Sequence, residues 1–460
     1  MTAGRPVIGV WGHYADANLG DDACPTALLH HLKRLLPTAR FVLFCRFPEI
    51  AQARWGWPAH PVHRLSPDQS GPWEPPPSLL HEDIGTAPQA APGGWRARAR
   101  TVAPLRAVIR AARALGVVAR TLPAELRFLR QSYSRLRGID LLVIAGSNPL
   151  FDFFGGFWEF PYRMWKWTLL ARLSGTRLAF VSVGAGPIVS ARSGRLLARV
   201  LRRADYVSFR DEGSRRLLRQ HGFEGPDHVC PDLAHSLPFD ARPRARSEHL
   251  RVGINPMIVY HGVFWPVRDS ALQQRYIESL AALAAALVAT GDDVFFYGTQ
   301  KDDRVTAGEI QSAFQSLTPS ITPPPFVMPA SIDELLDLCA SADLLVTTRF
   351  HGAVFGVLTA RPTLAICYQA KTREVLEAAG LGAHAIDFEQ VSSKRLRAAF
   401  DHLCAERSAV EAGLRSHAVA LRARLDRQYQ QVAALLRREP RQNGQVPSRS
   451  READVAGALS

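Results

Sequence analysis

Short apolar runs recur along the first half of the chain, and most of them are followed by apolar residues at helical spacing. Runs of this length are typical of strands that are buried on both faces of a sheet. The repeated order of strand and helix predicts a parallel α/β sheet. The predicted strands are Val7–Trp11, Arg40–Phe44, Leu141–Ala145, Leu178–Val183 and Tyr206–Phe209, and the first helix is expected over about Asp22–Leu35.

The second half of the chain repeats this pattern. A polar, proline-containing stretch at 238–250 separates the two sets of strands and predicts a domain boundary. We therefore expect two Rossmann-like α/β domains, over 1–240 and 250–437, with a long terminal helix from about Ser408 to Arg438 and a disordered tail over 438–460. The strands predicted here are Val252–Asn255, Val294–Tyr297, Leu344–Val346 and Thr363–Tyr368, with helices near Leu272–Thr290 and Ser331–Ala340.

An insertion of about 60–137 interrupts the first domain. Residues 60–95 are rich in proline and glycine, which predicts a long loop. Residues 95–137 combine many arginines with apolar residues at helical spacing and contain almost no acids. Two interpretations stay open for this basic segment: a surface that lies on anionic lipid, or helices that pack on the domain and keep their arginines in solvent.

Composition narrows the function classes. The chain has 460 residues, 47% of them hydrophobic, and a formal net charge of +14, which favours anionic partners. The six cysteines are scattered without a CxxC pair, so neither a zinc site nor a disulfide framework is indicated, and a reducing cytoplasm is expected. We recognise no signal peptide and no apolar run near the ~20 residues of a membrane span. Nucleic acid is disfavoured because no stacking aromatic pattern accompanies the charge.

The segment Leu344–Lys371 carries the most specific chemistry. It predicts a strand, a helix and a second strand, with Arg349 and His351 after the first strand and Lys371 after the second. Ligands of open α/β sheets bind beyond the carboxyl ends of the strands. An arginine fork and a lysine suit a carboxylate or phosphate, and a histidine moves protons near neutral pH. The alternative is that these residues merely sit on solvated loops.

Polar residues also follow the other predicted strands. The first strand leads to Asn18 and Asp21, the Leu141–Ala145 strand leads to Gly146-Ser147-Asn148, and Arg210 follows Tyr206–Phe209. Gly184-Ala-Gly-Pro187 and Asp232 follow in the same way. Each motif also has an ordinary explanation, since an aspartate often caps a helix and an Arg-Asp pair often forms a local ion pair.

Taken together, these residues resemble the polysaccharide pyruvyl transferase family. The matching pieces occur in the family's order and cover about residues 7 to 380. They are Asn18-Leu-Gly-Asp21-Asp22-Ala23, the Gly146 turn, Gly184-Ala-Gly186-Pro187, Ser208-Phe-Arg210-Asp211 with Ser214, Asp232, Arg349-Phe-His351-Gly352, and Pro362 through Tyr368 to Lys371. The chain departs from the family at Ser147 and Asn148, where two further glycines usually stand.

The resemblance implies a GT-B-like fold in which the pyruvyl group of phosphoenolpyruvate is transferred to a sugar of a surface polysaccharide or glycolipid precursor, forming a ketal and releasing phosphate. His351 and Arg349 would be catalytic, and no metal or other cofactor is expected. The donor would be bound by Arg349, Arg210 and Lys371, and the acceptor, on the N-terminal domain, by Asn18, Asp21, Asn148 and Asp232. The expected location is the cytoplasm, with possible attachment to the inner membrane face.

Two alternatives of different kinds remain at this point. One is a GT-B glycosyltransferase that uses a nucleotide sugar, which shares the fold but needs groups for a base and a ribose. The other is a non-catalytic protein that binds glycan or lipid, against which the presence of Arg349, His351 and Lys371 counts.

Overall fold

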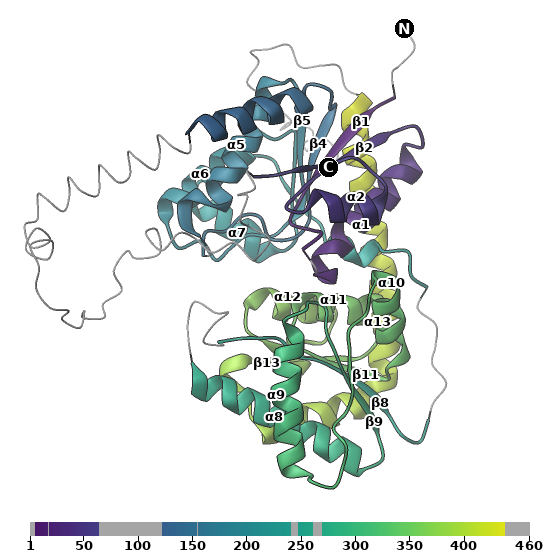
Figure 1. Ribbon diagram of the computed structural model, residues 1–460. Helices are drawn as coiled ribbons and strands as arrows, with labels where there is room; N and C mark the ends of the chain where they lie inside the picture. Colours follow the sequence, from purple (N-terminus) through teal and green to yellow (C-terminus); the bar gives the residue numbers. More distant parts are fainter. Residues whose placement is uncertain are drawn as a thin grey trace, which may run out of the picture.

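The structure is a computed structural model that describes residues 5–16, 18–63, 122–153, 155–240, 247–260 and 269–437. Within these residues the chain forms two parallel sheets, each covered by helices on both faces (Figure 1).

The N-terminal sheet has seven parallel strands in the order β3-β2-β1-β4-β5-β6-β7. Strand β4 is apolar throughout and buried along its whole length, as expected for a central parallel strand. The strands are β1 Val7–Trp11, β2 Arg40–Cys45, β3 Ala59–Pro61, β4 Leu141–Ala145, β5 Arg177–Val183, β6 Tyr206–Phe209 and β7 His228–Val229. The connecting helices include α1 Leu19–Leu35, α2 Pro48–Trp55, α5 Phe160–Leu173, α6 Ala191–Leu201 and α7 Glu212–Gln220.

The C-terminal sheet has six parallel strands in the order β10-β9-β8-β11-β12-β13, so both sheets reverse their strand order at the first strand. Such a switch point leaves a crevice at the carboxyl ends of the two strands beside it. The strands are β8 Arg251–Asn255, β9 Asp293–Tyr297, β10 Phe326–Val327, β11 Leu344–Thr347, β12 Thr363–Cys367 and β13 Ala385–Asp387. The helices are α8 Ser270–Ala289, α9 Asp303–Leu317, α10 Ile332–Ser341, α11 Phe350–Leu358 and α12 Ala370–Ala378.

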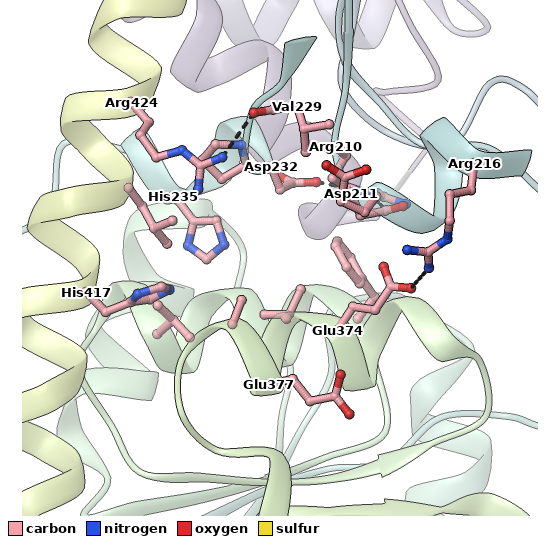
Figure 2. A pocket seen from close by; sticks show the side chains of 17 residues that line it. Arg210, Asp211, Arg216, Val229, Asp232, His235, Glu374, Glu377, His417 and Arg424 are labelled. Atoms are coloured by element: carbon pink, nitrogen blue, oxygen red, sulfur yellow. Dashed lines mark hydrogen bonds and ion pairs between the residues drawn. The ribbon is translucent and has the colours of Figure 1, made fainter. Parts of the chain in front are cut away.

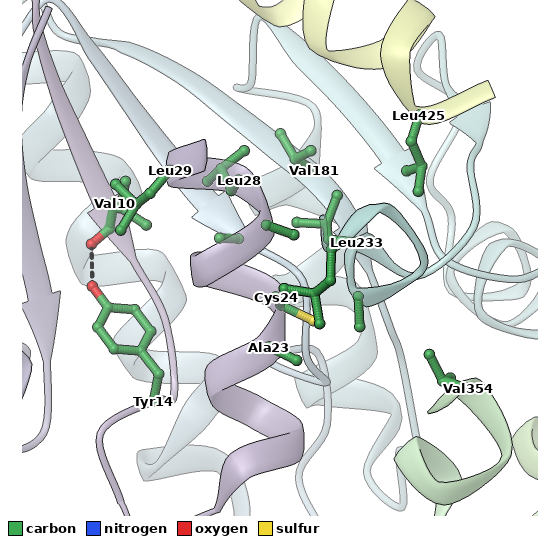
Figure 3. Packing of buried hydrophobic residues seen from close by; sticks show 14 of the residues in the cluster. Val10, Tyr14, Ala23, Cys24, Leu28, Leu29, Val181, Leu233, Val354 and Leu425 are labelled. Atoms are coloured by element: carbon green, nitrogen blue, oxygen red, sulfur yellow. Dashed lines mark hydrogen bonds between the residues drawn. The ribbon is translucent and has the colours of Figure 1, made fainter. Parts of the chain in front are cut away.

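One hydrophobic core is shared by the two halves. It surrounds α1, whose Cys24 and Leu28 pack against residues of the N-terminal sheet, and it extends to Val354 of α11 and Leu425 of the terminal helix (Figure 3). Removing apolar surface from water stabilises the contact between these elements, so the shared core holds the two halves together.

The terminal helix α13, Ser393–Ala434, is 42 residues long and runs from the C-terminal sheet to the N-terminal one (Figure 1). Gln428 accepts a hydrogen bond from Ser208 Oγ at 2.6 Å inside the N-terminal core. Tyr429 stacks on His31 at 4.6 Å between ring centroids, and its hydroxyl lies 2.7 Å from Ser236 Oγ. The end of α13 therefore packs with the N-terminal half, and the domain division at 240–250 stays a prediction.

The central strands were predicted within one or two residues, whereas two helix starts were wrong. Helix α1 begins at Leu19 rather than Asp22, because Asn18 caps it by accepting a hydrogen bond from the Gly20 N–H. Helix α13 begins at Ser393 rather than Ser408, because Ser392 provides a cap. The sequence analysis missed the short edge strands β3, β7, β10 and β13, because two or three residues are too few to show the hydrophobic pattern of a strand.

Most of the predicted insertion lies outside the described residues, as does the tail over 438–460. Residues 122–136 are helical and contact α5, where Lys166 Nζ lies 2.8 Å from Glu125 Oε1. The lipid-facing role of the basic segment 95–137 thus stays a prediction.

We expect the contact between α13 and the N-terminal core to be a major source of stability. Replacing the fully buried Tyr429 by alanine removes an aromatic side chain from that core and should lower the free energy of unfolding by about 3–5 kcal/mol. Tyr429→Phe keeps the ring and should cost only about 1 kcal/mol. Chemical denaturation measures both, with Val419→Ala, on an exposed position of the same helix, as the control. Similar stability for Tyr429→Ala and Val419→Ala would contradict the packing described here.

Candidate active site

A cavity of about 420 Å³ lies where the carboxyl ends of the two sheets face each other. Its walls come from the loops after β1, β4 and β6 on one side and after β8, β11 and β12 on the other. Seven of the eight residues that the sequence predicts for the site line this cavity: Asn18, Asp21, Asn148, Arg210, Arg349, His351 and Lys371. The eighth, Asp232, lies beside it. The fold thus brings together residues that are separated by more than 300 positions in the sequence.

Arg349 caps the start of α11 and is held by a buried carboxylate. Its Nε lies 2.8 and 3.0 Å from the two carboxylate oxygens of Asp303, and its Nη2 donates to the same group. Asp303 is completely buried. Burial alone would lower the pKa of Arg349, but the neighbouring Asp303 raises it, so the guanidinium stays charged. One edge of the arginine fork is therefore occupied, and among the described residues Nη1 has no hydrogen-bond partner.

Asp303 also organises the loop between β9 and α9. Its Oδ2 accepts hydrogen bonds from the backbone N–H groups of Thr299, at 2.9 Å, and Gln300, at 3.1 Å. The carbonyl of Thr299 in turn accepts a hydrogen bond from the N–H of Leu19, at 2.9 Å, at the start of α1. A single carboxylate therefore fixes Arg349 and the loop through which the C-terminal half contacts the N-terminal half.

Arg210 and Lys371 approach each other around the ring of Phe350. The guanidinium carbon of Arg210 is 4.3 Å from the ring centroid and Lys371 Nζ is 5.6 Å from it. Arg210 is also paired with Asp232 and Asp211, both at 3.4 Å. Lys371 has no ion pair within the described part of the chain, and burial together with Arg210 lowers its pKa to about 8. An anion in the cavity would stabilise the charged form of Lys371 and so offset the lowering of its pKa by burial and by Arg210.

His351 lies in the first turn of α11, not in a loop before the helix as the sequence suggested. Its ring packs against the start of α1 at Gly20, where an added Cβ would lie 2.4 Å from Nδ1, so only glycine leaves room for the imidazole. The Nε2 atom is buried and has no hydrogen-bond partner among the described residues. Burial lowers the pKa of His351, against the opposing effect of Asp232 and Asp21, so the imidazole is mostly neutral near pH 7.

Asp232 supports this histidine from the side of the N-terminal sheet. It is buried, it caps a short 3-10 helix through the N–H of Ala234, and it accepts a hydrogen bond from Cys24 Sγ at 3.2 Å. The ligand atoms of Cys24, Asp232 and His351 lie within 4.8 Å of one another, as a metal site requires. Burial and the neighbouring Asp232 raise the pKa of the Cys24 thiol well above its usual value, so the thiol is protonated near neutral pH in the absence of a cation.

The predicted acceptor residues Asn18, Asp21 and Asn148 lie on the N-terminal side of the cavity. Asn18 donates to Asp21 at 2.8 Å, which orients the carboxylate. Asn148 donates to the carbonyl of Gly186 at 2.6 Å, while its own carbonyl oxygen is buried and lacks a described partner. In the turn before it, Ser147 has φ of +52°, a backbone conformation that favours glycine, so the departure from three glycines is accommodated with strain.

Asp232 itself lines a second cavity, of about 590 Å³, behind Arg210 and Phe350 (Figure 2). His235 and His417 stand on one side of this cavity and Glu374 on the other. Burial lowers the pKa of His235 to about 4, so this histidine is neutral. The predicted acceptor residues are thus divided between two cavities that share the Arg210 and Phe350 side chains.

Asp303 and Phe350 are two residues important to the site that the sequence prediction missed. Asp303 follows β9 at the same sheet edge as the predicted residues, within the segment Lys301-Asp-Asp303. A polar residue after a strand was the signal used elsewhere, and it was available here too. Phe350 offered no such signal, since an aromatic residue between Arg349 and His351 is an ordinary core residue in the sequence.

Comparison with known proteins identifies the family. The sequence model of the polysaccharide pyruvyl transferase family matches residues 18–369. The chain belongs to this family. The matched region includes seven of the eight predicted site residues, and the eighth, Lys371, follows it by two positions. No curated protein sequence matches the chain.

Solved structures resemble this chain in fold. The UDP-GlcNAc 2-epimerase from Neisseria meningitidis bound to UDP-GlcNAc has 11% identity and a TM-score of 0.53, with 93% of this chain and 99% of that chain covered. The S. aureus MnaA–UDP structure has 9% identity and a TM-score of 0.49, covering 89% and 90%. A Streptomyces glycosyltransferase, SsfS6, has 13% identity and a TM-score of 0.44, covering 93% and 99%. The first likeness, with the two sheets described above, confirms the predicted GT-B-like fold.

No described helix is both long and apolar enough to cross a bilayer.

The pairing of Arg349 with Asp303 should be strongly coupled. Breaking a buried pair from one side typically costs about 3–5 kcal/mol because the other charge is left uncompensated. We expect that loss in the free energy of unfolding for Asp303→Asn, and we expect the double variant Asp303→Asn/Arg349→Met to lose clearly less than the sum of the single variants. Urea denaturation checks this. The exposed pair Arg397–Asp401 serves as control, where Asp401→Asn should cost less than about 1 kcal/mol. Additive losses at Asp303 and Arg349 would contradict the coupling.

Proposed function

We propose that this protein transfers the pyruvyl group of phosphoenolpyruvate to two hydroxyls of a sugar, forming a cyclic ketal and releasing phosphate. The observation that carries the proposal is the convergence of Arg210, Arg349 and Lys371 with a buried imidazole in one cavity. The donor carries a carboxylate and a phosphate close together, and a cavity with three cationic side chains matches that charge.

The three cations divide into different binding roles. Arg349 is fixed by Asp303, so its remaining Nη1 edge offers a rigid donor to a carboxylate or phosphate oxygen. Arg210 is held by Asp232 and by the face of Phe350. Lys371 lacks a described counter-ion and would gain most from an anion, because the depression of its pKa comes from burial and from the neighbouring Arg210.

The proposed reaction balances with one internal proton transfer. A proton adds to the methylene carbon of phosphoenolpyruvate, which becomes the methyl group of the ketal, and the adjacent carbon becomes electrophilic. The two sugar hydroxyls form two new C–O bonds to that carbon, and the bond to the phosphate oxygen breaks. The hydroxyls release two protons: one replaces the proton added to the methyl group, and the other leaves with phosphate as HPO₄²⁻.

His351 is the residue we assign to these proton transfers. In the ligand-free cavity its lowered pKa keeps it neutral, which suits a base that accepts a hydroxyl proton. A bound trianion would offset the repulsion from Arg210 and Lys371 and favour the imidazolium, which suits the acid that protonates the methylene carbon. Asp232 and Asp21 stabilise the same charged form.

The acceptor sugar would bind on the N-terminal side of the cavity. Asp21 and the carbonyl oxygen of Asn148 are acceptors for sugar hydroxyls, since the Asn148 oxygen is buried without a described partner. Phe151 and Phe160, with ring centroids 4.3 Å apart, add an apolar wall that suits the C–H face of a sugar ring. The proposed acceptor is a sugar, either free or attached to a lipid at the inner membrane face. Activity over a panel of acceptors identifies it.

A nucleotide-sugar glycosyltransferase is the rival function, because the epimerase structure with the same fold contains a nucleotide sugar. Two assays over a panel of saccharide acceptors distinguish these functions. Release of phosphate from phosphoenolpyruvate tests the pyruvyl transfer, and release of UDP from UDP-sugars tests the glycosyl transfer. Activity with UDP-sugars alone would replace our proposal, and activity with neither donor would favour a non-catalytic glycan-binding role.

We expect His351→Ala to lower turnover by a factor of ~10²–10⁴, the usual contribution of a positioned acid–base group, while phosphoenolpyruvate still binds. Phosphate release measures turnover and calorimetry measures donor affinity. His249→Ala, an exposed histidine outside the cavity, is the matched control and should behave as the native protein. Native-like turnover in His351→Ala would remove this residue from the chemistry.

The affinity for phosphoenolpyruvate should decrease as the pH rises through about 8. Lys371 is protonated below its pKa of about 8 and neutral above it, and only the charged form attracts the donor. The donor's own phosphate titrates lower, with a second pKa near ~6, so its charge is constant in this range. Lys371→Gln should bind the donor more weakly at pH 7 and show a flat profile between pH 7 and 9. An unchanged decrease in that variant would assign the titration to another group.

A further inference from the structure

A group of metal-ligand side chains lies on the C-terminal half, away from both cavities. His384 ends the short 3-10 helix Gly382–His384, directly before β13, while His402 and Glu406 lie on the first half of α13. His384 Nε2 is 3.1 Å from one carboxylate oxygen of Glu406, and His402 Nε2 is 3.6 Å from the other. One ligand atom from each of the three residues lies within 4.8 Å of the other two.

The spacing of these atoms fits a tetrahedral zinc ion. Zinc binds imidazole nitrogen and carboxylate oxygen at ~2.0–2.2 Å, so two ligands on one ion are separated by roughly 3.3–3.5 Å at the tetrahedral angle. The observed separations, 3.1 Å to one oxygen of Glu406 and 3.6 Å to the other, are close to that value. Two histidines with one glutamate and an open fourth position form a known zinc donor set.

The backbone also places the ligands appropriately. His402 and Glu406 are four residues apart on one helix, and residues at this spacing share a face. The side chain of His384 is almost fully buried, with 2% exposure, whereas those of His402 and Glu406 are 55% and 48% exposed. The N–H of His384 donates to the carbonyl of Leu381 at 2.9 Å, which fixes its backbone. One ligand is therefore anchored in the protein, and the other two leave access for an ion from solvent.

We propose that His384, His402 and Glu406 form a zinc site that joins the β13 edge of the C-terminal sheet to helix α13. The predicted absence of a metal site rested on the lack of clustered cysteines and clustered ligands in the sequence. His384 stands 18 positions before His402 and meets it only in the fold, with ring centroids 5.1 Å apart. The proposal does not depend on the proposed enzymatic activity, because none of the three residues lines either cavity.

The test is zinc binding by the full-length protein after treatment with a chelator. Titration with zinc chloride against a chromophoric chelator should show an ion bound with micromolar or tighter affinity, and zinc should raise the melting temperature, since an ion that binds only the folded state stabilises it. His402→Ala and Glu406→Gln change exposed side chains, so both variants should fold. Each should weaken the binding by at least about tenfold, because even supporting partners of a ligand contribute that much.

Two control variants separate this site from other zinc ligands. His249→Ala removes an exposed histidine elsewhere and should bind zinc as the native chain does. His351→Ala removes a member of the Cys24–Asp232–His351 group and should also retain the binding and the thermal shift. Affinity should fall at lower pH, because the imidazoles must be deprotonated to bind the ion. Equal zinc affinity in the native protein, His402→Ala and Glu406→Gln would overturn the proposal, as would millimolar binding by the native protein.

Discussion

The arrangement of the cavity between the two sheets depends on one buried carboxylate, that of Asp303. It binds one edge of the Arg349 guanidinium and accepts hydrogen bonds from two backbone N–H groups of the β9–α9 loop. In the same loop, the carbonyl of Thr299 accepts a hydrogen bond from the N–H of Leu19 in the opposite half. A buried charge is costly unless it is paired and hydrogen-bonded. The partners of Asp303 are Arg349 and the β9–α9 loop, so satisfying this charge also positions Arg349 and the loop.

The second constraint is that the cavity is assembled from two halves. Arg210 comes from the N-terminal sheet, whereas Arg349, His351 and Lys371 come from the C-terminal one. Arg210 and Lys371 both lie within cation–π distance of the Phe350 ring, which therefore stabilises a cation from each half. Neither half contains the whole set. The shared core around α1 and the span of α13 across both sheets therefore contribute to the site as well as to stability.

Electrostatics explain why such a cavity would suit a multiply charged anion such as the proposed donor. Lys371 lacks a described counter-ion, and its lowered pKa reflects the unfavourable placement of a charge beside Arg210 in a poorly solvated position. Asp211 and Asp232 offset Arg210 only in part, at 3.4 Å each. An incoming carboxylate and phosphate would complete the missing interactions, so favourable binding energy is available without rearrangement of Arg349, which Asp303 already fixes.

The amino-acid sequence by itself determined the two sets of parallel strands and seven of the residues that line the cavity. Short, fully apolar runs such as Leu141–Ala145 between helical patterns are typical of central strands, and polar residues that follow parallel strands gather at the carboxyl edge of the sheet. Arg210, Arg349 and Lys371 were predicted on that reasoning together with the family resemblance. Only the tertiary structure decided that Asp303 occupies one edge of the Arg349 fork, that Asp232 faces a second cavity, and that the end of α13 packs in the N-terminal core. These facts depend on contacts between distant segments, which local periodicity does not encode.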